Sequence, residues 1–542
     1  MAHSKKQNYL HGAAILTIGV AVTKILGFIY KIPLGNILGD EGMAHFNVAY
    51  NIYTFLLTLS TAGFPVVLSK MIAEANVLNR PMQAKRIFKV AFTAFLVLGS
   101  IASLLMFLFP AELAGGMDDI EAAQSIFALS PAVILVCILS AYRGYIQGYS
   151  NMTPTSMSQV IEVAVKVLFG LVLALLFSQS GRGLPEVSAA AIVGVPIGTL
   201  FACVYIFIVK KRMDREEEPL IKKAVDEQPP DGAGKILSQL LKIGIPIALG
   251  SSISSIITLL DTKLTMNRLQ AAAGFSFGET KILYGVYTKG LPLFNLPAAF
   301  ITPLTISVVP AIAAFVASKK HAEARNVTES SLRISTIMAI PMAVGISVLS
   351  EPIFNVLYRQ SAPEGPALLA VLGIASYFVC MSLVMIALLQ AYGAEQLPII
   401  PMLVGGGVKI AVNWVLVSNP EINIYGSPIG TICCYAVMCV MTYIFLQSRL
   451  KEKLSLNNII LRPLIASAAM GAAAYALYGL ASRVFLGDGD LSRMEMAIAM
   501  FGAIVVAAAI YLILIISTKA ITAEDMKLIP KGEKIAALLR IK

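Results

Sequence analysis

The stretch 17-TIGVAVTKILGFIYKIPLGNILGD-40 decides the fold, because it has the length and apolar content of a membrane-spanning helix and yet contains two lysines. Lys24 and Lys31 are seven positions apart, which places them within about 20° of each other on one face of a helix. A lysine at the centre of a lipid-facing helix costs roughly 2.5–3.5 kcal/mol. We therefore expect this cationic face to meet a wet cavity or a counter-ion.

The composition predicts a membrane protein with many spans. Of 542 residues, 57% are hydrophobic and 13% are charged, whereas an ordinary soluble domain has roughly 25% charged residues. The apolar residues come in runs of about 20, the length that crosses a bilayer as a helix. The first run is expected to remain in the mature chain, because Lys24 interrupts the apolar core that a cleavable signal peptide needs. The fourteen predicted spans are 10–34, 43–71, 87–110, 124–147, 155–178, 187–210, 236–265, 280–316, 326–349, 366–391, 397–417, 427–447, 459–482 and 494–518.

Lysine and arginine in the connections predict the orientation. If both ends of the chain lie on one side, that side holds 28 of the 42 basic residues and the other side holds 6. Basic residues accumulate on the cytoplasmic side, so both termini are expected there. The net charge of +11 mostly reflects this asymmetry and contact with anionic lipid, so no nucleic-acid partner is expected.

Eight lysines remain inside the predicted spans. Lys70 and Lys242 lie near cytoplasmic ends and are expected to extend their ammonium groups to the membrane surface. Because the spans hold few acids, so basic an interior favours an anionic ligand. The other six lysines are the candidate substrate-binding residues of a cavity: Lys24, Lys31, Lys166, Lys263, Lys289 and Lys409.

Three of these lysines also have a structural interpretation. Lys166 follows Glu162 by four positions, so an internal ion pair on one helix is about as well supported as a ligand contact. Lys263 shares a span with Asp261, and both Lys263 and Lys31 lie far enough out to reach the membrane surface. Lys24, Lys289 and Lys409 have no acid within four positions, and for these three a cavity role is favoured.

The sequence repeats itself weakly. The segment 142–166 recurs as 385–409 with identical Gln, Tyr and Lys residues at a constant offset of 243, and 50-YNIYT-54 recurs as 284-YGVYT-288. Matches in the same order at similar spacing predict two parallel halves. The expected domains are an N-lobe at 1–211, a cytoplasmic linker at 212–234, a C-lobe at 235–450, two additional spans within 451–518, and a cytoplasmic tail at 519–542.

Glycine and proline interrupt particular spans. The second predicted span is broken at 62-AGFP-65, and the eighth carries several prolines. Interrupted helices at matching places in two repeats are typical of transport sites and their hinges. The expected hinge residues are Gly27, Pro33, Gly63, Pro65, Pro292 and Pro297.

Catalytic and metal-binding motifs are scarce. The four histidines have no recognised metal-ligand spacing, and the six cysteines lie in apolar spans without a Cys-x-x-Cys pair. The match 274-GFSFG-278 lies in an external loop without the strand-turn-helix context of a nucleophile. We therefore expect neither an enzyme nor a cofactor or structural metal. A membrane-embedded transferase would also need acids or histidines clustered at a membrane face.

Several segments resemble a known family. The segment 23-TKILGFIYKIPLGNILGDEG-42, the pair 143-RGYIQGYSNMTP-154 and 389-LQAYGAEQLP-398, and the doubled six-plus-two plan are similar to the SpoVB/MurJ-type lipid-linked oligosaccharide flippases of the MOP exporter superfamily, which also contains the MATE drug exporters. The resemblance covers about the whole chain. It implies an all-α integral membrane protein with fourteen helices, two pseudo-symmetric lobes of six, and a cationic central cavity.

The resemblance also implies a function. Such proteins move undecaprenyl-pyrophosphate-linked glycans, typically the peptidoglycan precursor lipid II, to the outer leaflet of the bacterial plasma membrane. By resemblance, the family's basic positions match Lys24 and Lys289. The protein is expected to be a monomer in the phospholipid bilayer, working beside cell-wall synthesis proteins. A different lipid-linked polysaccharide is the alternative substrate, and a cation-coupled drug exporter the alternative class, although the latter would need carboxylates in its cavity.

The resemblance also raises the question of coupling to sodium. Some relatives hold a sodium ion among spans 7, 11 and 12, where this chain offers Asp261, Asn413 and Thr431. Lys409 is expected near the place of that ion, and an ammonium group there would repel sodium. The sequence therefore favours transport driven by the membrane potential.

Overall fold

The computed structural model describes residues 9–223, 229–450, 454, 457–485, 492–518 and 520–521, and every regular element in this part of the chain is a helix. Thirteen of the described helices are long and apolar enough to cross a membrane. This confirms the prediction of an all-α protein with many membrane spans. The count differs by one because the first of the thirteen, Ile18–Val77, is 60 residues long and covers most of the predicted span 10–34 and all of the predicted span 43–71.

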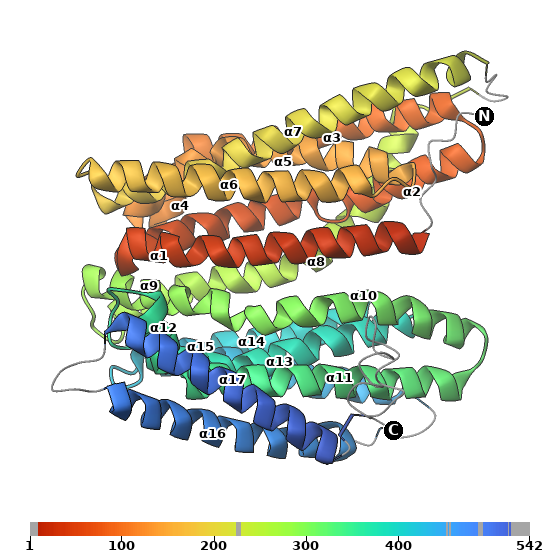
Figure 1. The fold of residues 1–542 in the computed structure, drawn as a ribbon. Helices are drawn as coiled ribbons and strands as arrows, with labels where there is room; N and C mark the ends of the chain where they lie inside the picture. Colours follow the sequence, from red (N-terminus) through yellow and green to blue (C-terminus); the bar gives the residue numbers. More distant parts are fainter. Residues whose placement is uncertain are drawn as a thin grey trace. The chain divides into compact units, whose positions relative to one another are not determined.

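The reversal inside this first segment occurs at a glycine. Helix α1 extends over Tyr9–Thr61, but Gly39 within it has φ 67° and ψ −165°, outside the helical region. Glycine adopts positive φ without the steric cost that a Cβ atom would add. The chain runs away from its N-terminal end, turns near Gly39 and returns to α2 (Figure 1). The segment Ile18–Val77 therefore accounts for two of the predicted membrane crossings.

The chain divides into two compact units, Met1–Asn267 and Arg268–Lys542. The sequence repeat predicts lobe boundaries at 211 and 235, and these boundaries stay a prediction. After α1, the helices of the first unit are α2 (Phe64–Val77), α3 (Pro81–Leu108), α4 (Pro110–Gly115), the 3-10 helix η1 (Ile120–Ala122), α5 (Ala123–Gly148), α6 (Thr153–Gln179), α7 (Leu184–Lys223) and most of α8 (Ala233–Ala271).

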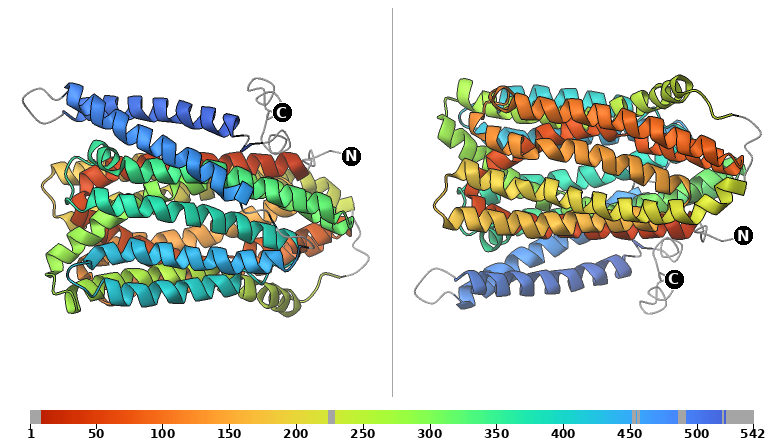
Figure 2. Two further views of the ribbon diagram at one scale, coloured as in Figure 1. Left: turned by 90° about the horizontal axis from the view of Figure 1, so that it is seen from below. Right: turned by 90° about the horizontal axis from the view of Figure 1, so that it is seen from above.

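Glycines allow the helices of the first unit to approach closely. A Cβ atom on Gly194 of α7 would lie 2.6 Å from the backbone nitrogen of Gly170 on α6. Small residues permit such close backbone packing in membranes, where no hydrophobic effect drives helices together. Figure 2 shows α6 and α7 side by side over most of their length. Helices α1 and α5 pack against the same pair, so α1 and α6, which carry candidate lysines, are neighbours.

The second unit contains the remaining helices and the C-terminal pair. Helices α16 and α17 pack together, α16 also contacts α11, and α17 contacts α12. The blue pair is visible in Figure 2. The elements are α9 (Phe277–Phe294), α10 (Leu296–Ala317), α11 (His321–Val348), α12 (Ser350–Leu357), α13 (Gly365–Ala391), α14 (Ile399–Leu416), the 3-10 helix η2 (Asn423–Tyr425), α15 (Gly426–Gln447), the π-helix η3 (Asn457–Leu461), α16 (Arg462–Phe485) and α17 (Arg493–Ser517).

The structure interrupts helices at two of the expected places. Helix α1 ends at Thr61 and α2 begins at Phe64, with Gly63 at φ 83° between them. Helix α9 ends at Phe294, and α10 begins at Leu296 with Pro297 in its first turn. A proline in the first turn has no hydrogen-bonding N–H to lose, so it marks a helix start. The proposed movement about these breaks stays a prediction.

Candidate functional site

Lys31 of α1 lies in an aromatic and amide environment within the first unit. Its Nζ donates a hydrogen bond of 3.1 Å to Oδ1 of Asn47. The same Nζ is 4.6 Å from the ring centroid of Phe46 and 5.7 Å from that of Tyr50. Aromatic faces attract ammonium groups through the ring quadrupole without neutralising their charge. These contacts fix the position of the Lys31 side chain without a carboxylate.

Lys166 of α6 approaches the same cluster from the neighbouring helix. Its Nζ lies 5.8 Å from the ring centroid of Tyr50 and 5.8 Å from that of Tyr30. Tyr30 is almost completely buried, with its hydroxyl donating to the backbone carbonyl of Ala191 at 3.3 Å. The side chains of Lys31 and Lys166 therefore share one tyrosine ring, although 135 positions separate them in the sequence. We call Tyr30, Lys31, Phe46, Asn47, Tyr50 and Lys166 the lysine–tyrosine cluster.

Of the two interpretations of Lys166, the internal pair with Glu162 is not the one that the structure has. Oε2 of Glu162 is 2.9 Å from Nη2 of Arg143, and Oε1 accepts a hydrogen bond of 3.1 Å from Thr199. Arg143 also donates from Nε to Ser158 at 2.8 Å. Because arginine reaches from α5 with a planar donor group, it satisfies the carboxylate better than the lysine one turn away. Among described residues, no carboxylate lies within 4.0 Å of the Lys166 ammonium.

Two further lysines of the first unit have different surroundings. Lys24 is exposed on α1, two turns before Lys31 and on the same face. Lys263 of α8 forms an ion pair with Asp118, with Nζ 2.7 Å from Oδ2, and the side chains are 38% and 24% exposed. An ion pair this exposed contributes on the order of 0–1 kcal/mol. The structure thus brings Lys31 and Lys166 together and places Lys263 beside a loop carboxylate.

Lys289 of α9 is completely buried within the part of the chain described. Its Nζ lies 3.3 Å from the backbone oxygen of Gln360 and 5.3 Å from the ring centroid of Tyr358. The Tyr358 hydroxyl in turn donates 2.8 Å to the backbone oxygen of Lys289. The structure therefore places this predicted substrate residue against the segment that follows α12.

A cavity lies next to that segment. Tyr358 lines a space of about 1000 Å³ together with Arg359 and Arg493. Arg493 is fixed there by hydrogen bonds of 2.7 Å and 3.2 Å to the backbone oxygens of Val356 and Leu357. The cavity belongs to the second unit alone and has a mixed polar and apolar lining.

The predicted sodium ligands lie in different units. Asp261 is buried on α8 of the first unit, whereas Asn413 and Thr431 are buried on α14 and α15 of the second. A Cβ atom on Gly430 would collide with Oδ1 of Asn413, so α14 and α15 meet closely at this point. Lys409 precedes Asn413 by one helical turn on α14 and is therefore on the same face.

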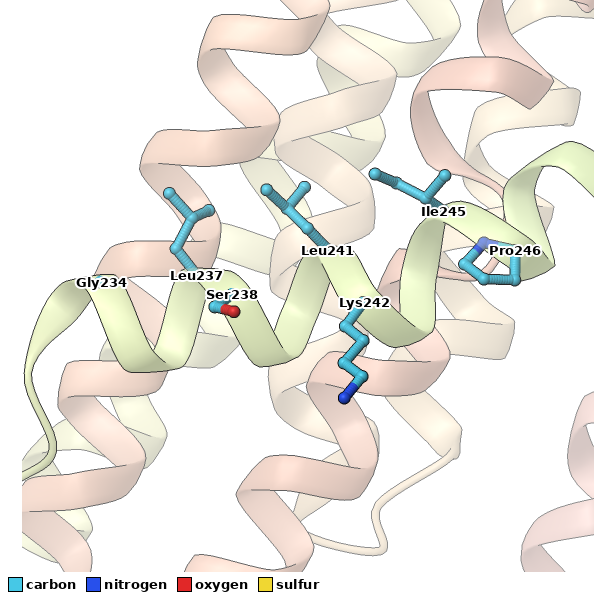
Figure 3. Close-up of a pocket in the computed structure, with 7 residues that line it drawn as sticks. All are labelled: Gly234, Leu237, Ser238, Leu241, Lys242, Ile245 and Pro246. Carbon is cyan, nitrogen blue, oxygen red and sulfur yellow. The ribbon is translucent and has the colours of Figure 1, made fainter.

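A shallower groove follows the first half of α8. Figure 3 shows Leu237, Leu241 and Ile245 in one row, with Lys242 pointing the other way. Spacing of four residues puts the three apolar side chains on one helical face. The groove offers no cluster of charged groups, so we do not assign it a ligand.

Sequence reasoning missed two features in and beside the lysine–tyrosine cluster. Arg143, which binds Glu162, lies inside the predicted span 124–147, and this position was a signal that could have been used. The sequence reasoning used 50-YNIYT-54 only as a repeat marker, yet Tyr50 is the ring that both lysines share. No sequence signal linked Asn47 to Lys31 before the fold was known.

Comparison with known proteins assigns the chain to a family. The model of the family described as "Polysaccharide biosynthesis protein" matches residues 9–316, more than half of the chain. The chain belongs to this polysaccharide biosynthesis protein family. Membership agrees with the resemblance that the motifs of the first and fourth helical segments predicted.

Three curated relatives from Bacillus subtilis (strain 168) align over almost their whole length. The uncharacterized membrane protein YabM is 26% identical over 532 residues, covering 98% of this chain and 96% of the relative. Stage V sporulation protein B is 25% identical, with coverage of 97% and 98%. The lipid II flippase MurJ is 25% identical, with coverage of 93% and 94%. This member of the polysaccharide biosynthesis protein family is thus similar to relatives of the same length.

Solved structures support the fold. A lipid II flippase MurJ in an inward closed conformation has a TM-score of 0.65 at 14% identity, covering 92% of this chain and 98% of that one. An inward-facing multidrug resistance MATE transporter of the MOP superfamily also has a TM-score of 0.65 at 14% identity, with coverage of 80% and 98%. This member of the polysaccharide biosynthesis protein family therefore has the MOP fold that the resemblance implied.

Proposed function

We propose that the protein is a flippase that moves an undecaprenyl-pyrophosphate-linked glycan from the inner to the outer leaflet of the bacterial plasma membrane. The full-length similarity to a lipid II flippase and to a sporulation protein supports this class. The family description points to polysaccharide building blocks. Lipid II, the peptidoglycan precursor, is the substrate that we favour.

The observation that carries the proposal is the pair of lysines at Tyr50. Neither Lys31 nor Lys166 forms an ion pair within 4.0 Å in the described residues, so no carboxylate there competes with a ligand for either side chain. A pyrophosphate is the one strongly anionic part of a lipid-linked glycan. Lysine binds phosphate as a point charge with three rotatable donors, which suits a group that must enter and leave.

The aromatic rings explain how two like charges are held near each other inside membrane helices. Each cation–π contact contributes about 0.5–2 kcal/mol, depending on desolvation, which offsets part of the cost of placing lysine in a span. A neutralising carboxylate would hold the lysines more firmly but would compete with the substrate. The lysine–tyrosine cluster therefore suits an anion that binds transiently.

The mechanism we favour is alternating access with a membrane-potential driving force. An inside-negative potential favours outward movement of an anion by about 2.3 kcal/mol per charge per 100 mV. After release, the cationic site is drawn inward by the same field. With both termini cytoplasmic, as the distribution of basic residues predicts, no coupling ion is required.

Two alternative transport functions differ from the proposed one in the ligand that the site would bind. A flippase for another lipid-linked polysaccharide would use the same phosphate-binding lysines, because the pyrophosphate is common to such carriers. A cation-coupled drug exporter is raised by the structural likeness to MATE transporters. Two lysines that lack carboxylate partners would repel a cationic drug, so we favour the anion carriers.

Complementation tests the proposed function. The protein is expressed in cells depleted of their lipid II flippase, and outer-leaflet lipid II is measured by its cleavage with an externally added enzyme. We expect rescue by the wild type and loss of rescue by Lys31→Met and Lys166→Met at equal abundance. Lys70→Met is the matched control, because Lys70 is an exposed span lysine whose nearest acid, Glu74, is 4.0 Å away. Wild-type rescue by both cluster variants would contradict the site.

A further inference from the structure

A buried histidine lies just beyond the turn at Gly39. His45 of α1 is completely buried, and its Nδ1 lies 2.9 Å and 2.8 Å from the two carboxylate oxygens of Asp119. Only a protonated nitrogen can donate to a carboxylate, so Nδ1 carries a hydrogen. In the neutral imidazole this fixes the tautomer and leaves a lone pair on Nε2. A carboxylate behind the ring is the arrangement that orients metal-binding histidines.

The carboxylate of Glu121 lies near this nitrogen, and that of Glu41 is close by. Nε2 of His45 is 3.4 Å from Oε2 of Glu121, and it makes no hydrogen bond to any described residue. Ligand atoms of Glu41, His45 and Glu121 all lie within 4.8 Å of one another. Glu41 precedes His45 by one turn of α1, which puts both on one helical face. A buried nitrogen without a hydrogen bond therefore opens onto a set of oxygen ligands.

We propose that Glu41, His45 and Glu121 bind a divalent cation of the zinc type, with Asp119 positioning the histidine. Zinc binds nitrogen and carboxylate oxygen at roughly 2.0–2.2 Å, so two ligands of a tetrahedral site are about 3.4 Å apart. The separation of 3.4 Å between His45 and Glu121 already matches this value. The Glu121 side chain is 43% exposed, which leaves access for the ion and a fourth position for water.

The types of ligand atom indicate which cation suits the site. Three carboxylates, those of Glu41, Asp119 and Glu121, surround one imidazole. A divalent ion would satisfy the buried Nε2 of His45 directly. A nitrogen ligand favours zinc over magnesium or calcium, which prefer oxygen alone.

The site would join two segments that the sequence separates widely. His45 and Asp119 are 74 positions apart, and Asp118 in the same loop holds Lys263 of α8. A bound ion would therefore fix the turn at Gly39 to the loop that precedes α5. This inference goes beyond the proposed flippase function and does not depend on it.

Cobalt titration tests the proposal on the purified full-length protein in detergent. Co²⁺ replaces Zn²⁺ in tetrahedral sites and then absorbs visible light strongly. After metal removal, we expect saturable binding of about one Co²⁺ per chain, with displacement by Zn²⁺, and a Tm that rises with Zn²⁺. Glu121→Gln is expected to weaken binding by at least about tenfold, because it removes a direct ligand and loss of an outer-shell partner alone typically costs about 10–100-fold.

Glu112→Gln is the control, because Glu112 is an exposed acid of α4 in the same region. This variant should bind Co²⁺ as the wild type does. Glu121 is also exposed, so its variant is expected to fold, and its elution profile and metal-free Tm check this. Absence of saturable binding to the wild type, or equal affinity in Glu121→Gln and wild type, would overturn the proposal and leave His45 as a hydrogen-bond partner of Asp119 only.

Discussion

Arg143 of α5 and Glu162 of α6 form a partly buried ion pair, with Nη2 2.9 Å from Oε2 and side chains 14% and 21% exposed. Thr199 and Ser158 complete the hydrogen bonds of the carboxylate and the guanidinium. Because Arg143 pairs with Glu162, Lys166 does not serve as the counter-ion of this carboxylate. The Lys166 side chain lies instead beside the rings of Tyr30 and Tyr50 in the lysine–tyrosine cluster.

The first prediction is a double-mutant cycle on this pair. Glu162→Gln and Arg143→Met should each lower stability by roughly 1–3 kcal/mol, because each leaves a partly buried partner uncompensated. The double variant should be milder than the sum of the two losses. A parallel cycle of Glu162→Gln with Lys166→Met should be close to additive. Thermal unfolding in detergent measures both cycles, and coupling confined to the Lys166 cycle would contradict the observed pairing.

The second prediction separates two glycines that were both expected at hinges. Gly63 has φ 83°, and a Cβ atom there would lie 2.6 Å from Cβ of Ile247, so Gly63→Ala should lower the Tm. Gly27 lies inside α1, and a Cβ atom added to it would meet nothing within 4 Å. Gly27→Ala should leave the Tm unchanged or raise it, since alanine favours a helix by about 0.5–1 kcal/mol.

If Gly27 is a hinge, the alanine variant should nevertheless transport more slowly than wild type. Transport at the wild-type rate with a raised Tm would remove Gly27 from the hinge residues. Gly63→Ala does not allow this separation, because its structural cost affects both measurements.

The third prediction concerns the start of α8. Asp231 accepts hydrogen bonds from Lys235 at 2.8 Å and from Gln83 at 2.9 Å, and its backbone N–H donates to Gln83 at 2.7 Å. The hydrogen bond from Lys235 lowers the pKa of the Asp231 carboxyl, with smaller contributions from Arg80 and Gln83. A lowered pKa stabilises the folded state above the ordinary aspartate value of about 3.9, and this contribution disappears as pH falls through the folded pKa.

Asp231→Asn should therefore remove a small stabilisation at neutral pH and leave acid stability unchanged. Limited proteolysis of the segment before α8 measures this, as cleavage rate against pH. An equal difference between wild type and variant at neutral pH and well below the folded pKa would contradict a charge-dependent contact.

How far the sequence predicts the fold can be judged from particular elements. Apolar runs predicted the spans well, because length and hydropathy are set by the bilayer. The number of helical segments that could span a membrane differs by one from the number of predicted spans, since Ile18–Val77 is one segment with a kink at Gly39. The helix interruption at Gly63 was predictable because glycine and proline act locally.

The sequence predicted that lysines form the candidate site, but it did not predict which groups contact each lysine. Eight span lysines are visible in the sequence, but their partners come from other helices. Arg143 displaces Lys166 from Glu162 across a helix interface, and Asp118 holds Lys263 from 145 positions away. His45 showed no motif because Asp119 is 74 positions distant. Contacts of this kind depend on tertiary packing, which helical periodicity does not describe.

The fourth prediction addresses energy coupling. Lys409 lies one turn from Asn413 on α14, and a sodium ion beside an ammonium group would be repelled by about 4 kcal/mol at 4 Å and an effective dielectric of 20. Flipping should therefore stop when valinomycin and high external potassium collapse the membrane potential. Replacing sodium with choline at constant potential should have little effect. The opposite pattern would refute a potential-driven mechanism and favour a sodium site.

The most direct test is flipping by the purified protein in vesicles with an imposed potential. Lipid II labelled on its headgroup is reconstituted with the protein, and its movement is followed by quenching from outside. We predict movement well above that in protein-free vesicles, slowed about 10–100-fold by Lys31→Met or Lys166→Met, since a hydrogen bond to a charged group contributes about 1.5–3 kcal/mol. Lys70→Met should behave as wild type. Absence of movement with the wild type, or wild-type rates in both cluster variants, would contradict a flippase that binds its substrate through the lysine–tyrosine cluster.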